Sequence, residues 1–233
     1  NGYFNLDRDL GIQMHHKFNI GKVVVVDKYA VSLGQGRNVT ATDTGGFSYT
    51  GRLEILPFGE FTDNGDYFDA DLMREPKPKL SLAAGYSFND NAYRQGGELG
   101  DFVKETRDLQ TFFADAMLKF RGWSLTSEYM NKQAHRSPVL DDTSSYFQTG
   151  WAWNIQSGYL FKNNVEVAGR YTVLNPSEAI LTHGLDESVN EYTLALSKYF
   201  KGHNLKIQTD FSYSTFSASE DGLRFRLQVE MAL

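Results

Sequence analysis

Charged side chains recur at every second position in this sequence, and that spacing decides what chemistry they can perform. Near the end of the chain, charged or polar and apolar side chains alternate through Leu223, Arg224, Phe225, Arg226, Leu227, Gln228, Val229 and Glu230. Successive side chains of a β-strand point to opposite faces, so this spacing predicts strands with one charged face and one apolar face. Charged faces of this kind can line a water-filled passage and bias the ions that cross it. The residues that we expect to line such a passage are Arg52, Lys119, Lys132, Arg170, Lys206, Arg224, Arg226, Glu128, Glu166 and Asp210.

Basic and acidic side chains occupy the predicted polar faces in equal numbers. The basic residues are Lys17, Arg52, Lys119, Lys132, Arg170, Lys206, Arg224 and Arg226, and the acidic residues are Asp9, Glu54, Asp115, Glu128, Glu166, Glu191, Asp210 and Glu230. A pore selects ions strongly when charges of one sign surround it. A balanced lining instead predicts salt bridges between strands and modest ion selectivity.

The acidic segment 59–78, GEFTDNGDYFDADLMREPKP, is a candidate metal site. Its carboxylates are Glu60, Asp63, Asp66, Asp69, Asp71 and Glu75. Clustered carboxylates can bind calcium, but this spacing matches no EF-hand loop, so we expect a solvated acidic loop. Because Phe61, Tyr67 and Phe68 lie among the carboxylates, we expect the loop to be ordered at the rim of the passage and not across it. The alternative is that it folds back and narrows the passage.

No arrangement of catalytic residues stands out in the sequence. Cysteine is absent, which excludes disulfides, thiolate metal sites and cysteine nucleophiles. The histidines are scattered without an HExxH pair. Serine, histidine and aspartate occur on several predicted strands, yet no spacing singles out a catalytic triad. We therefore predict a protein that is not an enzyme and that uses no metal or other cofactor.

Long strands must position these side chains. Alternation of period two recurs near 7–18, 24–34, 46–57, 79–89, 112–120, 123–132, 150–161, 164–174, 190–200, 204–214 and 222–233. Strands of globular proteins have about five or six residues. Most of these segments are about twice as long, as a tilted span of a bilayer requires.

The connectors between these segments alternate between short and long. The tight turns are FNIGK, FRGW, FKNN and FKGHN, and the long polar connectors are 35–46, 89–106, 133–146, 175–189 and 214–222. Short periplasmic turns and long outside loops are typical of an outer-membrane barrel. Aromatic residues beside the short turns predict a girdle at the membrane interface: Phe18, Phe120, Trp123, Tyr159, Phe161, Tyr199 and Phe200.

The sequence therefore predicts an all-β fold, an antiparallel transmembrane β-barrel of the outer membrane, with residues 1–233 in a single domain. The alternative is a soluble β-sandwich or β-solenoid, which strand length, aromatic girdle and alternating connectors all disfavour. Counting strand directions back from a periplasmic C-terminus places Asn1 outside the cell, whereas single-chain barrels keep both termini in the periplasm. We therefore expect this chain to be the C-terminal part of a longer barrel.

Several segments, in order along nearly all of the chain, also resemble a known family. They are RDLGIQMHHKF, YAVSLGQGRN, GRLEILPFGEF, PKLSLAAGYSFNDNA, ADAMLKFRGWSLTSEYM, GWAWNIQSGYLFKNNVEVAGRY and YFKGHNLKIQTDFSYS. The sequence resembles the phosphate-selective porin O and P family, in the form carried by Bacteroidetes-type bacteria. The resemblance implies a trimeric outer-membrane channel of about sixteen strands. The balanced charge departs from the basic lining with which the best-studied members of that family select anions.

We expect from these patterns and this resemblance a porin of the bacterial outer membrane. It would be a water-filled channel for passive diffusion of small hydrophilic or anionic solutes such as phosphate. Its expected partners are outer-membrane lipid and copies of itself in a homotrimer; the net charge of −6 makes nucleic acid an unsuitable partner. The alternative is a structural or accessory barrel of a larger secretion or nutrient-uptake complex, plugged by 59–78 or by a partner. A barrel enzyme is a third hypothesis.

Overall fold

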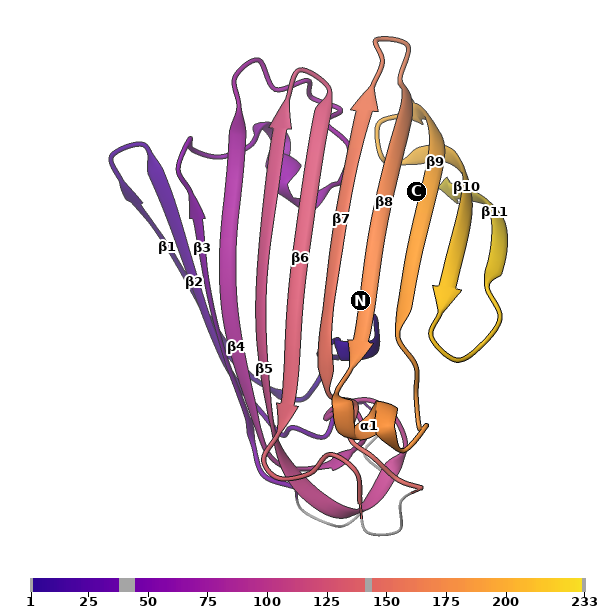
Figure 1. Ribbon diagram of the computed structural model, residues 1–233. Coiled ribbons are helices and arrows are strands. Elements are labelled where there is room, and N and C mark those ends of the chain that lie inside the picture. The colour runs from indigo at the N-terminus through magenta and orange to yellow at the C-terminus, as the bar shows by residue number, and fades with distance from the viewer. Residues whose placement is uncertain (1, 38–44, 141–143, 232–233) are drawn as a thin grey trace.

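Eleven strands make up most of the structure, a computed structural model that describes residues 2–37, 45–140 and 144–231. The strands form one sheet in chain order, and each is antiparallel to the next (Figure 1). They are β1 (Gly11–Ile20), β2 (Val23–Ser32), β3 (Ser48–Leu56), β4 (Lys79–Arg94), β5 (Phe102–Phe120), β6 (Trp123–Ala134), β7 (Gly150–Leu160), β8 (Val165–Pro176), β9 (Val189–Lys201), β10 (Leu205–Phe216) and β11 (Gly222–Met231). The predicted all-β, antiparallel fold is confirmed.

The helices of the described residues are short and lie outside the strands. They are η1 (Gly2–Phe4), η2 (Thr62–Tyr67) and α1 (Glu178–Thr182). In this part of the chain, no helix has the length and apolar character needed to cross a membrane.

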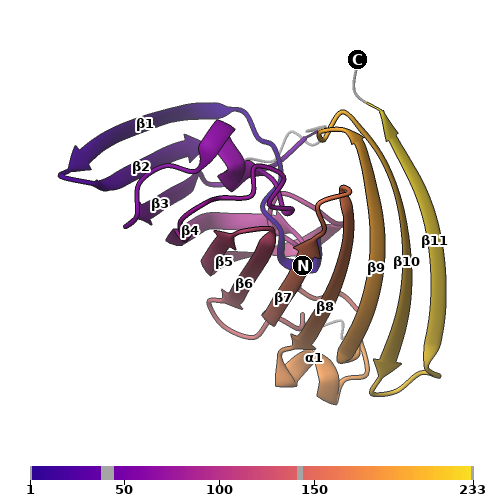
Figure 2. The same cartoon turned by 90° about the horizontal axis from the view of Figure 1, so that it is seen from above.

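The sheet curves, and its concave side encloses η1 and η2 (Figure 2). Successive strands are joined at one end by the turns 21–22, 121–122, 161–164 and 202–204, which we call the turn end. The described parts of the connectors at the opposite, loop end are 33–37, 45–47, 95–101, 135–140, 144–149, 177–188 and 217–221. Strands β1 and β11 form the two edges, and the described residues leave the sheet open between them.

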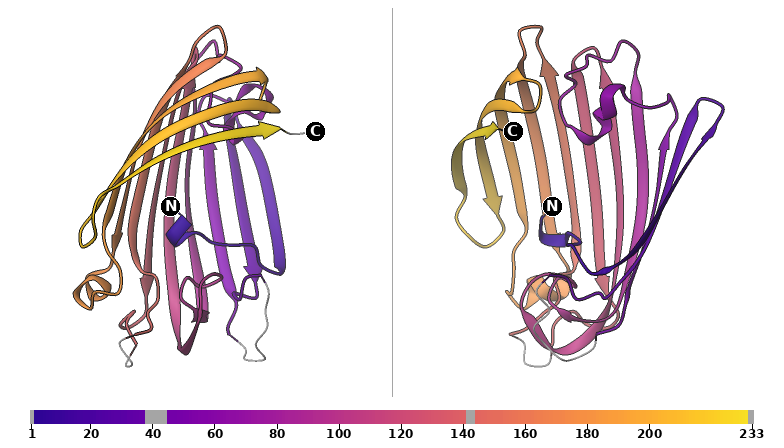
Figure 3. Two further views of the ribbon diagram at one scale, coloured as in Figure 1. Left: turned by 90° about the vertical axis from the view of Figure 1, so that its right-hand side faces the viewer. Right: turned by 180° about the vertical axis from the view of Figure 1, so that it is seen from behind.

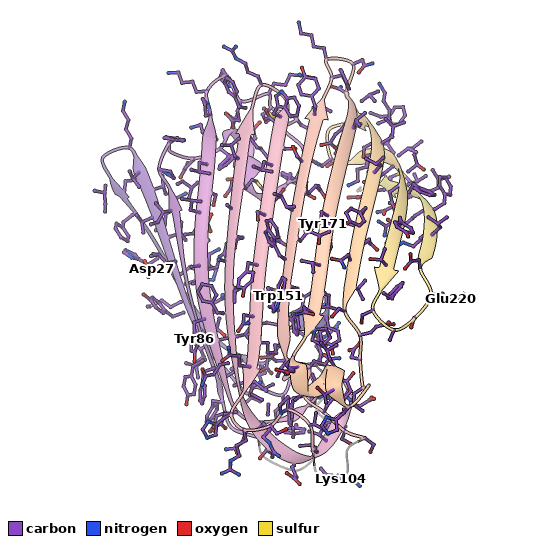
Figure 4. The ribbon with its side chains drawn as sticks, viewed as in Figure 1. Asp27, Tyr86, Lys104, Trp151, Tyr171 and Glu220 are labelled. Carbon is purple, nitrogen blue, oxygen red and sulfur yellow. The ribbon has the colours of Figure 1, made fainter. Side chains whose placement is uncertain are left out.

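Apolar side chains cover the convex face of the sheet. On β11, Leu223, Phe225, Leu227 and Val229 are between 62% and 70% exposed. The same holds in the middle of the sheet, where Leu194 is 68% exposed. Figure 4 labels three aromatic residues of this convex face: Tyr86, Trp151 and Tyr171. This alternation agrees with the faces predicted from the sequence.

Aromatic rings gather on the convex face at the turn end. The rings of Trp123 and Tyr159 lie 4.9 Å apart between centroids, and Phe161 meets Tyr159 edge-on at 5.0 Å. Tyr199 was expected in the same girdle, but that prediction is wrong. Its side chain points to the concave face, is 5% exposed and donates a hydrogen bond of 2.7 Å to Glu166. This is the side that the alternation of β9 gives it, because Tyr199 shares the parity of Thr193 and Ser197.

Two strands are longer than the sequence predicted. The segment 89–106 was expected to be a loop, but β4 continues to Arg94 and β5 begins at Phe102. The extension follows irregular pairing after Asn89, where Asn91 has a positive φ of 48°. Polar residues and a bulge interrupt the apolar alternation there, so the pattern gave no sign of a strand.

Buried apolar residues form small clusters where connectors pack onto the concave face. At the turn end, Phe61 packs with Val24 and Leu56, and Ala70 packs with Leu160 and Tyr199. At the loop end, a third cluster contains Ala92, Leu109, Leu140 and Phe147. The concave face therefore carries its apolar packing near the two ends of the strands.

Candidate functional site: the polar concave face

Ion pairs between strands dominate the charges of the concave face. Arg52 on β3 pairs with Asp115 on β5 through two contacts, of 2.5 Å and 3.0 Å, and lies 3.9 Å from Glu54. Glu128 is opposite Asp115 in the register of β5 and β6. Further ion pairs link strands within the region from β8 to β11. They are Arg170–Glu191 at 3.2 Å, Arg224–Glu191 at 2.9 Å, Arg226–Asp210 at 2.8 Å and Lys206–Glu230 at 2.9 Å. The predicted salt bridges between strands are present, and they offset most of the charge on this face.

Lys119 was expected to line a passage, but it is only 2% exposed. Its ammonium donates hydrogen bonds to the carbonyl oxygens of Gly65, Phe68 and Ala70, at 2.6, 2.5 and 2.8 Å. All three carbonyls belong to the segment 59–78, which covers this part of the concave face. Lys119 therefore holds the segment in place and does not contact water in a passage.

The segment 59–78 is internally bonded and not a solvated acidic loop. Asp71 and Glu75 are 1% and 2% exposed. Asp71 accepts hydrogen bonds from the backbone N–H groups of Gly122, at 2.7 Å, and Glu75, at 3.1 Å. Glu75 accepts bonds from the N–H and hydroxyl of Thr62, at 2.6 and 3.1 Å. The expectation of full solvation is wrong for these two carboxylates, because each anchors backbone that would otherwise be unpaired.

The same segment crosses the concave face near the turn end (Figure 3, right). It begins beside β1 and β2, where Glu60 pairs with Lys17 and Phe61 packs on Val24. It reaches the turn between β9 and β10, where Phe68 stacks on His203 with ring centroids 3.9 Å apart. The segment is therefore ordered at the turn end, as expected, but it also reaches over part of the concave face there.

Lys132 was also expected to line a passage, but it is 1% exposed. It donates a hydrogen bond of 2.7 Å to the carbonyl oxygen of Gly96. Next to that carbonyl, Glu98 is 4% exposed, and burial raises the pKa of its carboxyl. The connector 95–101 thus covers Lys132 at the loop end much as the segment 59–78 covers Lys119 at the turn end.

Between these covered regions the concave face holds a polar hollow of about 330 Å³. Its floor comes from β7 to β11, and the segment 59–78 closes one side with Phe68 and Asp69. The polar side chains that border it include Gln156, Glu166, Arg170, Lys206, Gln208 and Glu230. A smaller cavity of about 30 Å³ continues from it toward Asp210 and Arg226, and the two share Gln156, Arg170 and Gln208.

His203 borders the hollow from the turn 202–204. Burial lowers the pKa of its imidazole below the ordinary value, and the nearby positive charges of Lys119 and Lys206 lower it further. The imidazole is therefore neutral near pH 7, which also suits its stacking on the ring of Phe68.

The structure brings some of the sequence-predicted residues together and separates others. Those at the hollow or its continuation are Glu166, Arg170, Lys206, Asp210 and Arg226. Arg52 and Glu128 lie apart from it on β3 and β6, and Arg224 pairs with Glu191 on β9. Reasoning from charge missed Gln156 and Gln208, although their alternation with apolar neighbours places both amides on the polar face.

Comparisons with protein-family models, with curated proteins and with solved structures give no match for this chain. The functional argument therefore depends on the two faces of the sheet and on the polar hollow.

Proposed function

We propose that this chain forms the wall of a transmembrane β-barrel in the outer membrane of a bacterium, and that its concave face lines a passage for small hydrophilic solutes. The observation that carries the proposal is the contrast between the two faces. Exposed apolar side chains occur on the convex face from β1 to β11, for example Ile12 at 83% and Phe225 at 70%. A soluble monomer rarely exposes so extended an apolar surface, whereas lipid accommodates it.

The pairing of the backbone supports the same proposal and adds one requirement. Every backbone group inside the hydrocarbon region must be hydrogen-bonded, and a bilayer therefore accepts sheets only as closed barrels. The edges β1 and β11 each have one neighbour among the described strands. In the membrane both edges are hydrogen-bonded to strands that complete the barrel.

The paired charges favour diffusion over strong selection. Arg170, Lys206 and Arg226 each have a carboxylate within 3.2 Å. A solute in the passage meets dipoles and ion pairs of both signs, which replace part of its hydration without a strong preference for one charge. Small anions such as phosphate pass by this route, but they are not retained.

A second candidate function is a structural or accessory barrel of a larger envelope complex. One observation favours it: the segment 59–78 crosses the concave face and is fastened there by Lys119. A segment held in this way can act as a plug that leaves little space for solutes.

Conductance across planar lipid bilayers distinguishes the two functions. We expect the assembled barrel, in which β1 and β11 are both paired, to insert and to give discrete, ohmic current steps. In an accessory barrel the wild-type chain is silent, and steps appear only after deletion of residues 62–74. If neither form conducts and both remain in the aqueous phase after mixing with liposomes, the membrane proposal is wrong.

A further inference from the structure

Small side chains create the hollow in the concave face. Ala168 on β8 is directly opposite Ala195 on β9, and Ala168 is also opposite Gly158 on β7. Ala168 and Ala195 line the hollow, where their neighbours Arg170 and Gln156 are long and polar, whereas the carboxylate of Glu166 occupies the space above Gly158. The small side chains therefore form a depression in the middle of the floor, and long polar side chains border it.

Two buried polar atoms at this floor have no hydrogen-bond partner among the residues that the structure describes. They are Nε of Arg170 and Oδ1 of Asp210, and both residues line the small continuation of the hollow. The other carboxylate oxygen of Asp210 pairs with Arg226, and the side chain of Asp210 is only 1% exposed. A buried polar atom without a partner is costly, so these two atoms mark the small continuation of the hollow as a strongly polar site.

The charges around the hollow are nearly balanced. The acidic residues that line the hollow and its continuation are Asp69, Glu166, Asp210 and Glu230, and the basic residues are Arg170, Lys206 and Arg226. The three basic groups are all in ion pairs. A phosphate dianion would meet no unpaired cation there and would be repelled by the surplus carboxylate.

We propose that this hollow binds uncharged, hydroxyl-rich solutes of about the size of a monosaccharide. This inference rests on the proposed function, because it names the class of solute that the passage favours. A hydroxyl group both donates and accepts hydrogen bonds, so it suits a border that offers both donors and acceptors. The amides of Gln156 and Gln208 offer a donor and an acceptor on two sides of the floor.

The size and composition of the hollow fit this class of solute. Small-ligand sites begin at about 300 Å³, and this hollow has about 330 Å³. Phe68, which is 41% exposed, borders the hollow and provides an apolar surface for the C–H groups of a sugar ring. Because one side remains open to the passage, we expect weak binding, with a Kd of about 1 mM or higher.

Binding is tested on the full chain in detergent micelles. Saturation-transfer NMR measures methyl α-glucoside, and ³¹P line broadening measures inorganic phosphate. We expect saturable binding of the glucoside and none of phosphate. Filling the floor by Ala168→Leu or Ala195→Leu should weaken glucoside binding by about tenfold or more. Ala30→Leu on β2 is the matched control, because Ala30 shares the concave face but does not border the hollow.

A second variant keeps the proposal testable if the leucine variants fold poorly. Gln208→Lys adds one unpaired cation at the floor and should reduce glucoside binding while phosphate binding appears. Equal glucoside binding in the wild type and in all floor variants would overturn the proposal, as would phosphate binding by the wild type in place of the glucoside. Glucoside binding without conductance would support the binding site and contradict the proposed channel. Conductance without glucoside binding would support the channel and contradict the binding site.

Discussion

Arg52 on β3 and Asp115 on β5 form a two-contact ion pair that reaches over the intervening strand β4. The positions beneath the pair on β4 are Ala83, opposite Asp115, and Gly85, opposite Arg52. Gly85 must remain small, because a Cβ atom there would lie 2.2 Å from the ring of Phe113. The ion pair therefore depends on small side chains on β4, which leave room for Arg52 and Asp115 to meet above that strand.

We expect the energies of Arg52 and Asp115 to be coupled. Their side chains are 25% and 29% exposed, so the pair lies between a surface salt bridge and a buried one. A double-mutant cycle with Arg52→Ala and Asp115→Ala should give a coupling free energy of about 1–2 kcal/mol. Denaturant unfolding in micelles measures it. Strictly additive effects would show that the pair adds nothing to the stability of the sheet.

Lys119→Met should release the segment 59–78 from the concave face. The change removes three hydrogen bonds from a buried ammonium and leaves the carbonyls of Gly65, Phe68 and Ala70 without that donor. We expect a loss of about 2–4 kcal/mol in the free energy of unfolding. We also expect faster proteolysis within 59–78. Lys28→Met on β2 is the control, and cleavage at equal rates in the two variants would argue against an anchoring role.

The stacking of His203 on Phe68 should make the turn end sensitive to acid. Because the pKa of His203 is lowered in the folded chain, the unfolded chain takes up the proton first as the pH falls. Stability is therefore complete above the ordinary histidine pKa and is lost as the pH falls through the lower, folded value. We expect proteolysis of 59–78 to increase as the pH falls below the ordinary histidine pKa of about 6.5. His203→Asn should reduce this increase, and an unchanged pH profile in that variant would assign the effect to another group.

Leu227→Arg should destabilise the membrane-inserted chain by about 2–4 kcal/mol, because it places a charge on the face that we assign to lipid. Leu227 is 64% exposed, so the same change in a soluble protein would have little effect. Gln228→Arg is the matched control on the opposite face of β11. The fraction folded into liposomes across a denaturant series is the measurement. Equal behaviour of the two variants would favour a soluble sheet.

The number, order and facing of the strands could be predicted from the sequence because they follow from local alternation. The environments of Lys119 and Lys132 could not. Each lysine is buried by a connector that returns to the concave face from elsewhere in the chain, and alternation along one strand has no information about that contact. The side taken by Tyr199 was predictable, since it shares the parity of Thr193 and Ser197 in β9; the girdle prediction considered only its position beside the turn.

The hollow was only partly predictable for the same reason. Alternation correctly placed Arg170 and Lys206 on the polar face. It did not show that Ala168 and Ala195 would be cross-strand neighbours, because the register of two strands depends on both partners. Small residues at a polar face carry no signal by themselves, and only their pairing makes a depression.

Reversal potentials in a salt gradient should show a modest ion preference that single charge changes can move. Arg226→Gln removes a cation that is 46% exposed and leaves the buried carboxylate of Asp210 without its partner, so we expect a shift toward cations. Glu230→Gln on the same face of β11 is the matched opposite change, since it leaves Lys206 unpaired and should shift the potential toward anions. Planar-bilayer recordings of both variants at equal protein load provide the measurement. A strong phosphate preference that neither change affects would place the selecting residues outside this part of the concave face.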